Sequence, residues 1–162
     1  MTLRIGVVSD VHMRSEYRAE LTEELSGVVD RLEAFDPDLV VALGDVVEDE
    51  TAEPDREHVE VVRERLDFGP PLRLLAGNHD VQNLSVETLR SLFGSPLVGT
   101  RRIGGETLVF LNSAAQRLGD PRGELDGKSL ELLAELEPDE PVTVFVHHPL
   151  HYRDLSDTVW WS

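Results

Sequence analysis

Short apolar runs alternate with amphipathic segments through the first half of the chain. Residues 3–9 (LRIGVVS), 38–44 (DLVVALG) and 71–77 (PLRLLAG) are runs of strand length, so each predicts a buried strand. Between them, residues 16–35 and 57–66 carry apolar side chains at helical spacing, with charged residues on the opposite face. This order of strands and helices predicts parallel strands that are joined by helical crossovers.

The second half of the chain has a different pattern. Residues 85–93 predict a short helix, and residues 97–113 predict two strands that turn at a Gly-Gly dipeptide. A further helix is expected over 126–136, and a last apolar strand over 142–148. Because the sequence has no repeat and no linker, we expect residues 1–162 to form one α/β domain with an antiparallel portion.

Side chains of the types that bind metals follow four of the predicted strands. They are Asp10 and His12, then Asp45, then Asn78 and His79, and finally His147 and His148. We expect the four strands to point the same way in a parallel sheet, so that their ends meet at one edge, where such folds bind ligands. A polar turn is the simpler explanation for any one of these strand ends. It would have to hold at all four, and the combination therefore favours a functional site.

Composition narrows the kind of site. The chain has no cysteine, so any metal would be held by oxygen and imidazole ligands. The formal net charge is -17, and Lys128 is the single lysine. Such a composition is typical of salt-loving microbes, in which salt screens the repulsion between acidic groups, although an ordinary acidic protein is the alternative. The acidity disfavours nucleic acid as a partner, but less so in a salt-adapted proteome.

The chain carries no sign of a membrane segment or of a leader. It has no apolar run near the ~20 residues of a membrane span, and its first residues lack the apolar region of a secretory signal. We therefore expect a soluble, cytoplasmic protein.

Taken together, the motifs Asp-x-His, Gly-Asp, Gly-Asn-His-Asp and His-His-Pro resemble the calcineurin-like metallophosphoesterase superfamily. They occur in the order of that family and extend from Asp10 to Pro149. The resemblance implies an α/β fold with a two-sheet β-sandwich flanked by helices. It also implies hydrolysis of phosphoester bonds by a dinuclear metal centre and a metal-activated water.

The resemblance further implies a role for each matching residue. Asp45 would bridge the two metals, Asp10 and His12 would hold the first, and Asn78 and His147 would hold the second. Mixed oxygen and nitrogen ligands suit manganese, iron, zinc or cobalt, among which the sequence does not choose. His79 would act on the phosphoryl group or protonate the leaving oxygen, and Glu48 would orient His79. His148 and His151 would contact the substrate. Asp80 is expected to order its own turn, and His58 to lie on the surface.

One motif of the family, Gly-His-x-His, does not occur in the sequence. Three protein ligands would then remain for each metal, which predicts weaker metal binding. We expect the chain to be a fragment of a longer protein, with an incomplete second sheet. A natural short variant, or a partner chain that supplies the histidines, is the alternative. The alternative function is a non-catalytic interaction module on the same fold, and a nuclease would need a basic groove that the sequence does not show. Monoesters, diesters and cyclic nucleotides all remain open as substrates, as does the oligomeric state.

Overall fold

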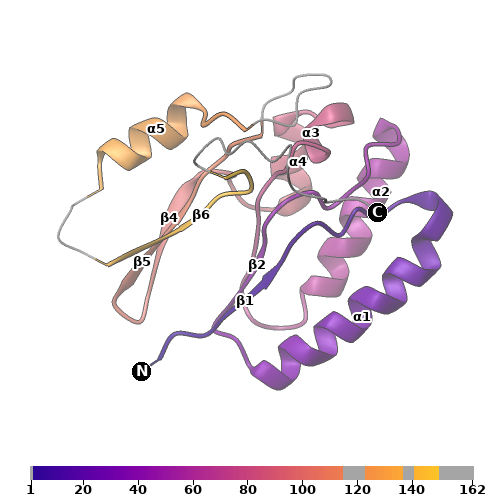
Figure 1. The fold of residues 1–162 in the computed structure, drawn as a ribbon, viewed down its shortest axis with the longest axis horizontal. Coiled ribbons are helices and arrows are strands. Elements are labelled where there is room, and N and C mark those ends of the chain that lie inside the picture. The colour runs from indigo at the N-terminus through magenta and orange to yellow at the C-terminus, as the bar shows by residue number, and fades with distance from the viewer. Residues whose placement is uncertain (1, 115–122, 137–140, 150–162) are drawn as a thin grey trace, which may run out of the picture.

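The computed structural model describes residues 2–114, 123–136 and 141–149. Two three-stranded sheets stack face to face, with helices on their outer sides (Figure 1). The first sheet has the order β1 (Ile5–Val8), β2 (Leu39–Ala42) and β3 (Leu72–Leu74), and the second has the order β4 (Gly99–Ile103), β5 (Glu106–Phe110) and β6 (Val142–Phe145). The expected two-sheet α/β fold is confirmed.

The first sheet is fully parallel because its successive strands are joined by helical crossovers. The crossovers are α1 (Arg18–Phe35), which follows a short 3-10 turn at Ser15–Tyr17, and α2 (Ala52–Leu66). The strands succeed one another in chain order, so both helices lie on the same face of the sheet, where they pack against each other (Figure 1). The other face is left for the second sheet.

The alternation of side chains along β2 separates two hydrophobic clusters. Leu39 and Val41 face the second sheet, where they pack with Phe110 and Phe145, whose rings are stacked. Ala42 belongs to the cluster beneath the helices instead. Every residue of β2 is buried, as expected for a central strand that is covered on both faces.

The second sheet is mixed. β4 and β5 form the expected hairpin, in which Gly104 and Gly105 adopt the positive φ angles that a tight turn requires. β6 is parallel to β5 and belongs to this second sheet. The expectation that all four strand ends belong to one parallel sheet is therefore wrong for the last strand, although its end reaches the same edge of the sandwich (Figure 1).

Three shorter helices complete the described chain, namely α3 (Asp80–Asn83), α4 (Val86–Phe93) and α5 (Gly127–Ala134). The Ser85 side chain caps α4 by accepting the Thr88 N–H at 3.2 Å, and Asp126 caps α5 by accepting the Ser129 N–H at 2.8 Å. None of the helices in the described ranges is long and apolar enough to cross a membrane.

Two sequence-based expectations about α2 are corrected. The helix begins at Ala52, five residues before residue 57, because a proline in the first turn of a helix breaks no hydrogen bond and Pro54 is tolerated there. His58 is only 1% exposed and lies on the packed face of the helix with Val59 and Val62. It is therefore a core residue rather than a surface one.

Candidate active site

The loops that follow β1 and β2 run side by side, because the strand register continues beyond the strands. Asp10 donates its backbone N–H to the Gly44 carbonyl at 3.1 Å, and His12 donates to the Asp45 carbonyl at 3.0 Å. A parallel bridge between Met13 and Val47 then closes the pairing. This pairing sets the two aspartates and the histidine beside one another at the carboxyl edge of the sheet.

The loop after β3 comes very close to Asp45. The backbone N–H of His79 donates to Asp45 Oδ1 at 2.9 Å. A Cβ atom on Gly77 would collide with the Asp45 carboxylate and backbone, and one on Gly44 would lie 2.7 Å from Gly77 N. The two glycines of the Gly-Asp and Gly-Asn-His-Asp motifs are therefore needed for the close approach of these loops.

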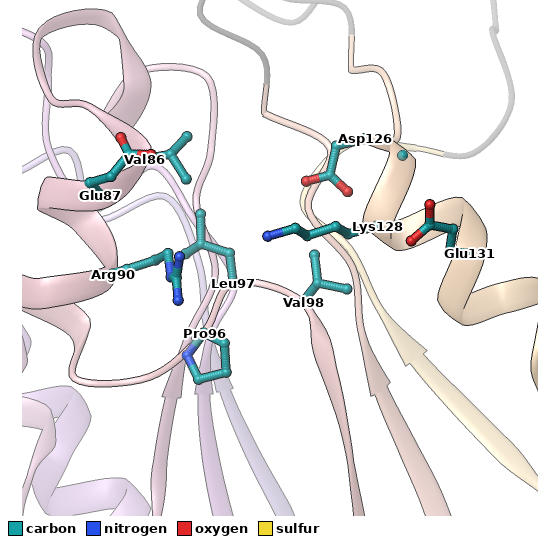
Figure 2. A pocket seen from close by; sticks show the side chains of 10 residues that line it. Val86, Glu87, Arg90, Pro96, Leu97, Val98, Asp126, Lys128 and Glu131 are labelled. Atoms are coloured by element: carbon teal, nitrogen blue, oxygen red, sulfur yellow. The ribbon is translucent and has the colours of Figure 1, made fainter.

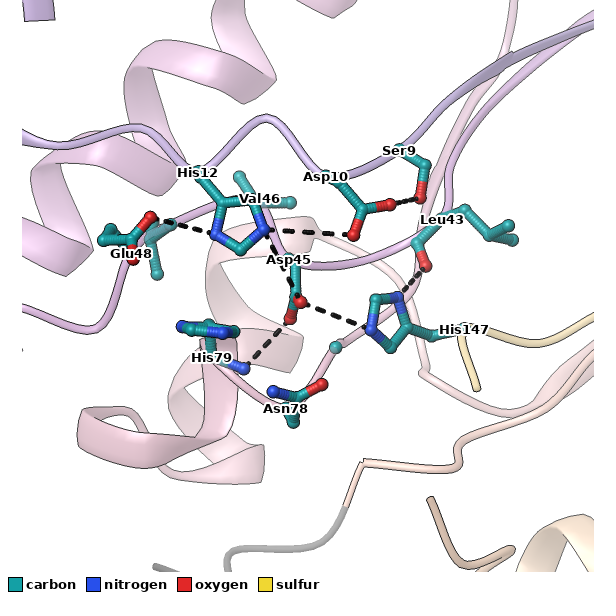
Figure 3. Close-up of polar contacts among 12 residues, drawn as sticks. Ser9, Asp10, His12, Leu43, Asp45, Val46, Glu48, Asn78, His79 and His147 are labelled. Atoms are coloured by element: carbon teal, nitrogen blue, oxygen red, sulfur yellow. Dashed lines mark hydrogen bonds and ion pairs between the residues drawn. The ribbon is translucent and has the colours of Figure 1, made fainter. Parts of the chain in front are cut away.

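Asp45 lies at the centre of the residues that the sequence singled out (Figure 3). Its Oδ2 atom is 3.4 Å from His147 Nε2 and 3.8 Å from His12 Nε2. Asp10 Oδ1 lies 3.9 Å from the same His12 nitrogen. Asp10, Asp45 and His147 each offer a ligand atom, and these three atoms lie within 4.8 Å of one another. His147 is held by its other nitrogen, Nδ1, which is 2.9 Å from the Leu43 carbonyl.

The charges of Asp45 and His147 reinforce each other. Burial alone would raise the pKa of Asp45, but its contact with His147 and the hydrogen bond from His79 lower that pKa below its ordinary value. Burial would likewise lower the pKa of His147, but Asp45 raises it overall. A negatively charged oxygen is therefore kept at the centre of the site, as metal binding requires.

A second group of three residues lies next to the first, made of His12, Glu48 and His79. Glu48 Oε2 is 3.1 Å from His12 Nδ1 and 3.0 Å from an Arg14 guanidinium nitrogen. His79 Nδ1 instead lies 3.5 Å from Asp49 Oδ2. The structure thus differs from the expected pairing of Glu48 with His79, because the loop after β2 turns Glu48 toward His12 and Asp49 toward His79. Since the two acidic residues are adjacent in the chain, their positions alone could not distinguish them.

Asn78 and His148 meet across the two sheets. His148 is 6% exposed, and its Nε2 atom lies 3.1 Å from Asn78 Oδ1. Its Nδ1 atom lies 2.8 Å from the Ser113 hydroxyl. Sequence reasoning overlooked Ser113, although it follows the strand β5 just as the other site residues follow theirs. His151, for which a substrate contact was expected, lies outside the described residues.

Asp80 orders its own turn, as expected, and also joins that turn to the loop after β2. Its Oδ2 accepts the Gly77 N–H at 2.8 Å, and its Oδ1 accepts the N–H groups of Val46 and Val47 at 2.8 and 3.2 Å. Complete burial raises the pKa of Asp80 to about 7 despite these hydrogen bonds.

The donor atoms at this edge fit divalent metal ions. Carboxylate oxygens, an amide oxygen and imidazole nitrogens converge there, and the ligand atoms of Asp10, Asp45 and His147 lie close enough to share one ion. A third group, made of Glu50, Asp55 and His58, does not fit as well. Both Asp55 oxygens already accept hydrogen bonds there, from the Glu50 N–H and from Asn83.

A separate cleft of about 530 Å³ lies between α4 and α5 (Figure 2). Arg90 and Lys128 line it together with Glu87, Asp126 and Glu131, so that charges of both signs face it. None of the residues assigned to the metal site lines this cleft.

Comparison with known proteins gave a family and a number of structural neighbours, among them a phosphatase and a nuclease. The family model described as calcineurin-like phosphoesterase matches residues 3–161. A dimetal phosphatase from Danio rerio superposes with a TM-score of 0.71 at 15% sequence identity, covering 92% of this chain and 70% of that one. A Pseudomonas putida nuclease MPE gives a TM-score of 0.39 at 28% identity, covering 63% of this chain and 51% of that one. No match was found among curated proteins.

Proposed function

The chain belongs to the calcineurin-like phosphoesterase family, and from that membership we propose that it hydrolyses phosphoester bonds with a dinuclear metal centre. The substrate class is a small phosphoester. Asp10, His12 and Asp45 would hold one ion, and Asp45, Asn78 and His147 would hold the other. Bound divalent ions supply charge neutralisation at phosphoryl oxygens and lower the pKa of a bound water to about 7.

The observation that carries the proposal is the position of Asp45 between two imidazoles. His12 and His147 approach the same Asp45 oxygen from different sides, at 3.8 and 3.4 Å (Figure 3). A carboxylate that bridges two cations needs other ligands on both of its sides, and this arrangement supplies them. His12 has Asp10 beside it, whereas His147 is on the side of Asn78.

We assign to His79 a role on the substrate rather than in metal binding. Its backbone holds Asp45, so its ring stands next to the centre, and its side chain is 29% exposed. The partly exposed ring can donate a proton to the leaving oxygen, a kind of help that contributes about 10²–10⁴-fold to the rate. Asp49, 3.5 Å from His79 Nδ1, would orient the ring for this transfer.

The experiment that tests the proposal measures metal uptake and hydrolysis separately. Purified protein is stripped with a chelator and titrated with Mn²⁺ by calorimetry. Hydrolysis of an aryl phosphate monoester and of a bis-aryl diester is then followed with Mn²⁺ present. We expect binding and hydrolysis by the wild-type chain. Asp45→Asn should lose both, and His79→Ala should lose hydrolysis while it keeps Mn²⁺ binding.

Asp30→Asn is the matched control, because Asp30 is an exposed acidic residue on α1 and is not one of the assigned site residues. It should behave as the wild type does. Folded wild-type protein that takes up no Mn²⁺ even in excess would contradict the proposal and favour an interaction module. Hydrolysis that survives in both Asp45→Asn and His79→Ala would contradict the roles assigned to these two residues.

A further inference from the structure

The ends of β5 and β6 place Ser113 next to His148. The two residues are 35 positions apart, which is also the spacing of the paired residues of β5 and β6, such as Phe110 and Phe145. The Leu111 N–H extends this pairing by donating to the Phe145 carbonyl at 3.0 Å. The contact therefore follows from the register of two paired strands and not from a chance approach of loops.

Ser113 makes two hydrogen bonds to the same histidine. Its oxygen accepts the backbone N–H of His148 at 3.2 Å, and it lies 2.8 Å from the ring atom Nδ1. Both partners are buried, with Ser113 3% and His148 6% exposed. Gly123 packs against the ring so closely that a Cβ atom there would collide with His148 Cβ and Cγ. The ring is therefore fixed in position.

The hydrogen-bond partners also decide which nitrogen of His148 carries the proton. Asn78 Oδ1, 3.1 Å from His148 Nε2, is a carbonyl oxygen and can only accept, so Nε2 must donate. In a neutral ring Nδ1 is then an acceptor, and the Ser113 hydroxyl supplies the proton for that bond. The same hydroxyl oxygen remains able to accept the His148 backbone N–H.

We propose that Ser113 is a positioning residue of the active site, which acts through His148 on Asn78. Ser113 holds the backbone and the ring of His148 in place, and His148 in turn donates its Nε2–H to the Asn78 oxygen and fixes that oxygen on the side of Asp45 and His147. This inference rests on the proposed function, in which Asn78 is a metal ligand. Residues that orient a ligand in this way typically change metal affinity about 10–100-fold when they are mutated.

The test begins with the tautomer, which can be measured without any metal. In chelator-treated protein labelled with ¹⁵N at histidine, long-range ¹H–¹⁵N spectra report which ring nitrogen is protonated. The His148 signals are identified by their loss in His148→Asn. We expect the Nε2–H form in the wild type and in Ser113→Thr, which keeps the hydroxyl. In Ser113→Ala the Asn78 oxygen should still favour the Nε2–H form, but Nδ1 loses its hydrogen bond, so its ¹⁵N signal should shift. An Nδ1–H ring in the wild type would overturn the proposal.

The second measurement is Mn²⁺ binding by calorimetry. Ser113→Ala should weaken the binding of one Mn²⁺ ion roughly 10-fold or more, and Ser113→Thr should restore it. Ser129→Ala is the control, because Ser129 is also buried and bonds to the neighbouring Asn112 without touching His148. It should bind Mn²⁺ as the wild type does. Equal affinity in Ser113→Ala and the wild type would overturn the positioning role.

The two measurements separate this inference from the proposed function. If the wild type showed the Nε2–H tautomer but bound no Mn²⁺, the function would fail and with it the role of Ser113 in metal binding. If the wild type bound Mn²⁺ and Ser113→Ala bound it equally well, only the role of Ser113 would fail.

Discussion

Asp45 Oδ1 accepts the backbone N–H of His79 at 2.9 Å, so the carboxylate at the centre of the site is held by the loop that carries the proposed acid. A single hydrogen bond thus joins the Asp45 side chain to the His79 backbone. Any displacement of the loop after β3 should disturb both the metal centre and the proton donor.

Gly77→Ala is expected to cause such a displacement. The added methyl group would collide with the Asp45 carboxylate and backbone, and overpacking of this kind costs about 1–3 kcal/mol in free energy of unfolding. We expect a lower midpoint in urea unfolding and weaker Mn²⁺ binding by calorimetry.

Gly27→Ala is the control, because a Cβ atom on this helical glycine would meet nothing within 4 Å. It should stabilise the protein by about 0.5–1 kcal/mol and leave Mn²⁺ binding unchanged. Normal binding in Gly77→Ala would show that the close approach is dispensable.

Asp49 and Glu48 should have separable effects on catalysis. Asp49→Asn removes the carboxylate beside His79, so kcat should fall roughly 10-fold while Mn²⁺ affinity stays unchanged. Glu48→Gln weakens the contact with His12, so it should mainly raise the Mn²⁺ concentration needed for activity. Steady-state kinetics across a Mn²⁺ titration measures both effects. If Glu48→Gln lowered kcat and Asp49→Asn raised the Mn²⁺ requirement instead, Glu48 would be the partner of His79.

His58 should make the folded protein less stable in mild acid. Burial lowers its pKa below 6.5, although Glu50, at 3.6 Å, opposes that shift. Because the unfolded chain then binds the proton more readily, this contribution to stability is present above pH 6.5 and is lost as the pH falls through the lowered pKa.

The measurement compares urea unfolding of the wild type and His58→Gln at several pH values, with a chelator present. The difference in free energy of unfolding should narrow as the pH falls from about 7 to about 5. A difference that grows in acid would mean that the ion pair with Glu50 outweighs burial.

The net charge of -17 predicts a strong dependence of stability on salt. The screening length falls from about 10 Å at 0.1 M to about 3 Å at 1 M salt, so repulsion among acidic groups weakens over that range. A salt-adapted protein should show a Tm that keeps rising with NaCl up to molar concentrations. For an ordinary acidic protein, the rise should level off at a few tenths molar.

A charge-reduced variant provides the control for this measurement. Glu23 and Glu24 are exposed on α1, and replacing both with glutamine removes two negative charges from that surface. The variant should have a higher Tm at low salt and gain less from added NaCl. A Tm that does not respond to the substitution would mean that the salt effect is not electrostatic.

Strand periodicity is enough to predict how the first three strand ends come together. Parallel strands in register place equivalent positions side by side, and this pairing continues past the strands to Met13 and Val47. The polar residues that follow each of these strands can therefore be assigned to one edge from the order of strands and helices along the chain.

The remaining features depend on packing between distant segments. Nothing within residues 142–148 indicates that this strand joins the second sheet, because a short apolar run predicts a strand without indicating which sheet it joins. His58 could not be assigned to the core for a similar reason: a polar residue on the packed face of a helix interrupts the apolar pattern. The pairing of Asp49 with His79 depends on the turn of a single loop, about which periodicity carries no information.

The backbone at the proposed metal site adopts a left-handed conformation that most residues avoid. Within the described ranges, the non-glycine residues with positive φ are Asp10, His12, Asp36, Asp45 and Asp49, and three of these five are proposed metal ligands. Such a conformation typically costs about 1 kcal/mol or more for a residue with a Cβ atom. Glycine at these positions would relieve the strain but remove the ligands. Selection for stability alone would therefore favour the replacement of these proposed ligands. Thermally stabilised variants chosen without an activity screen should accumulate changes at these positions.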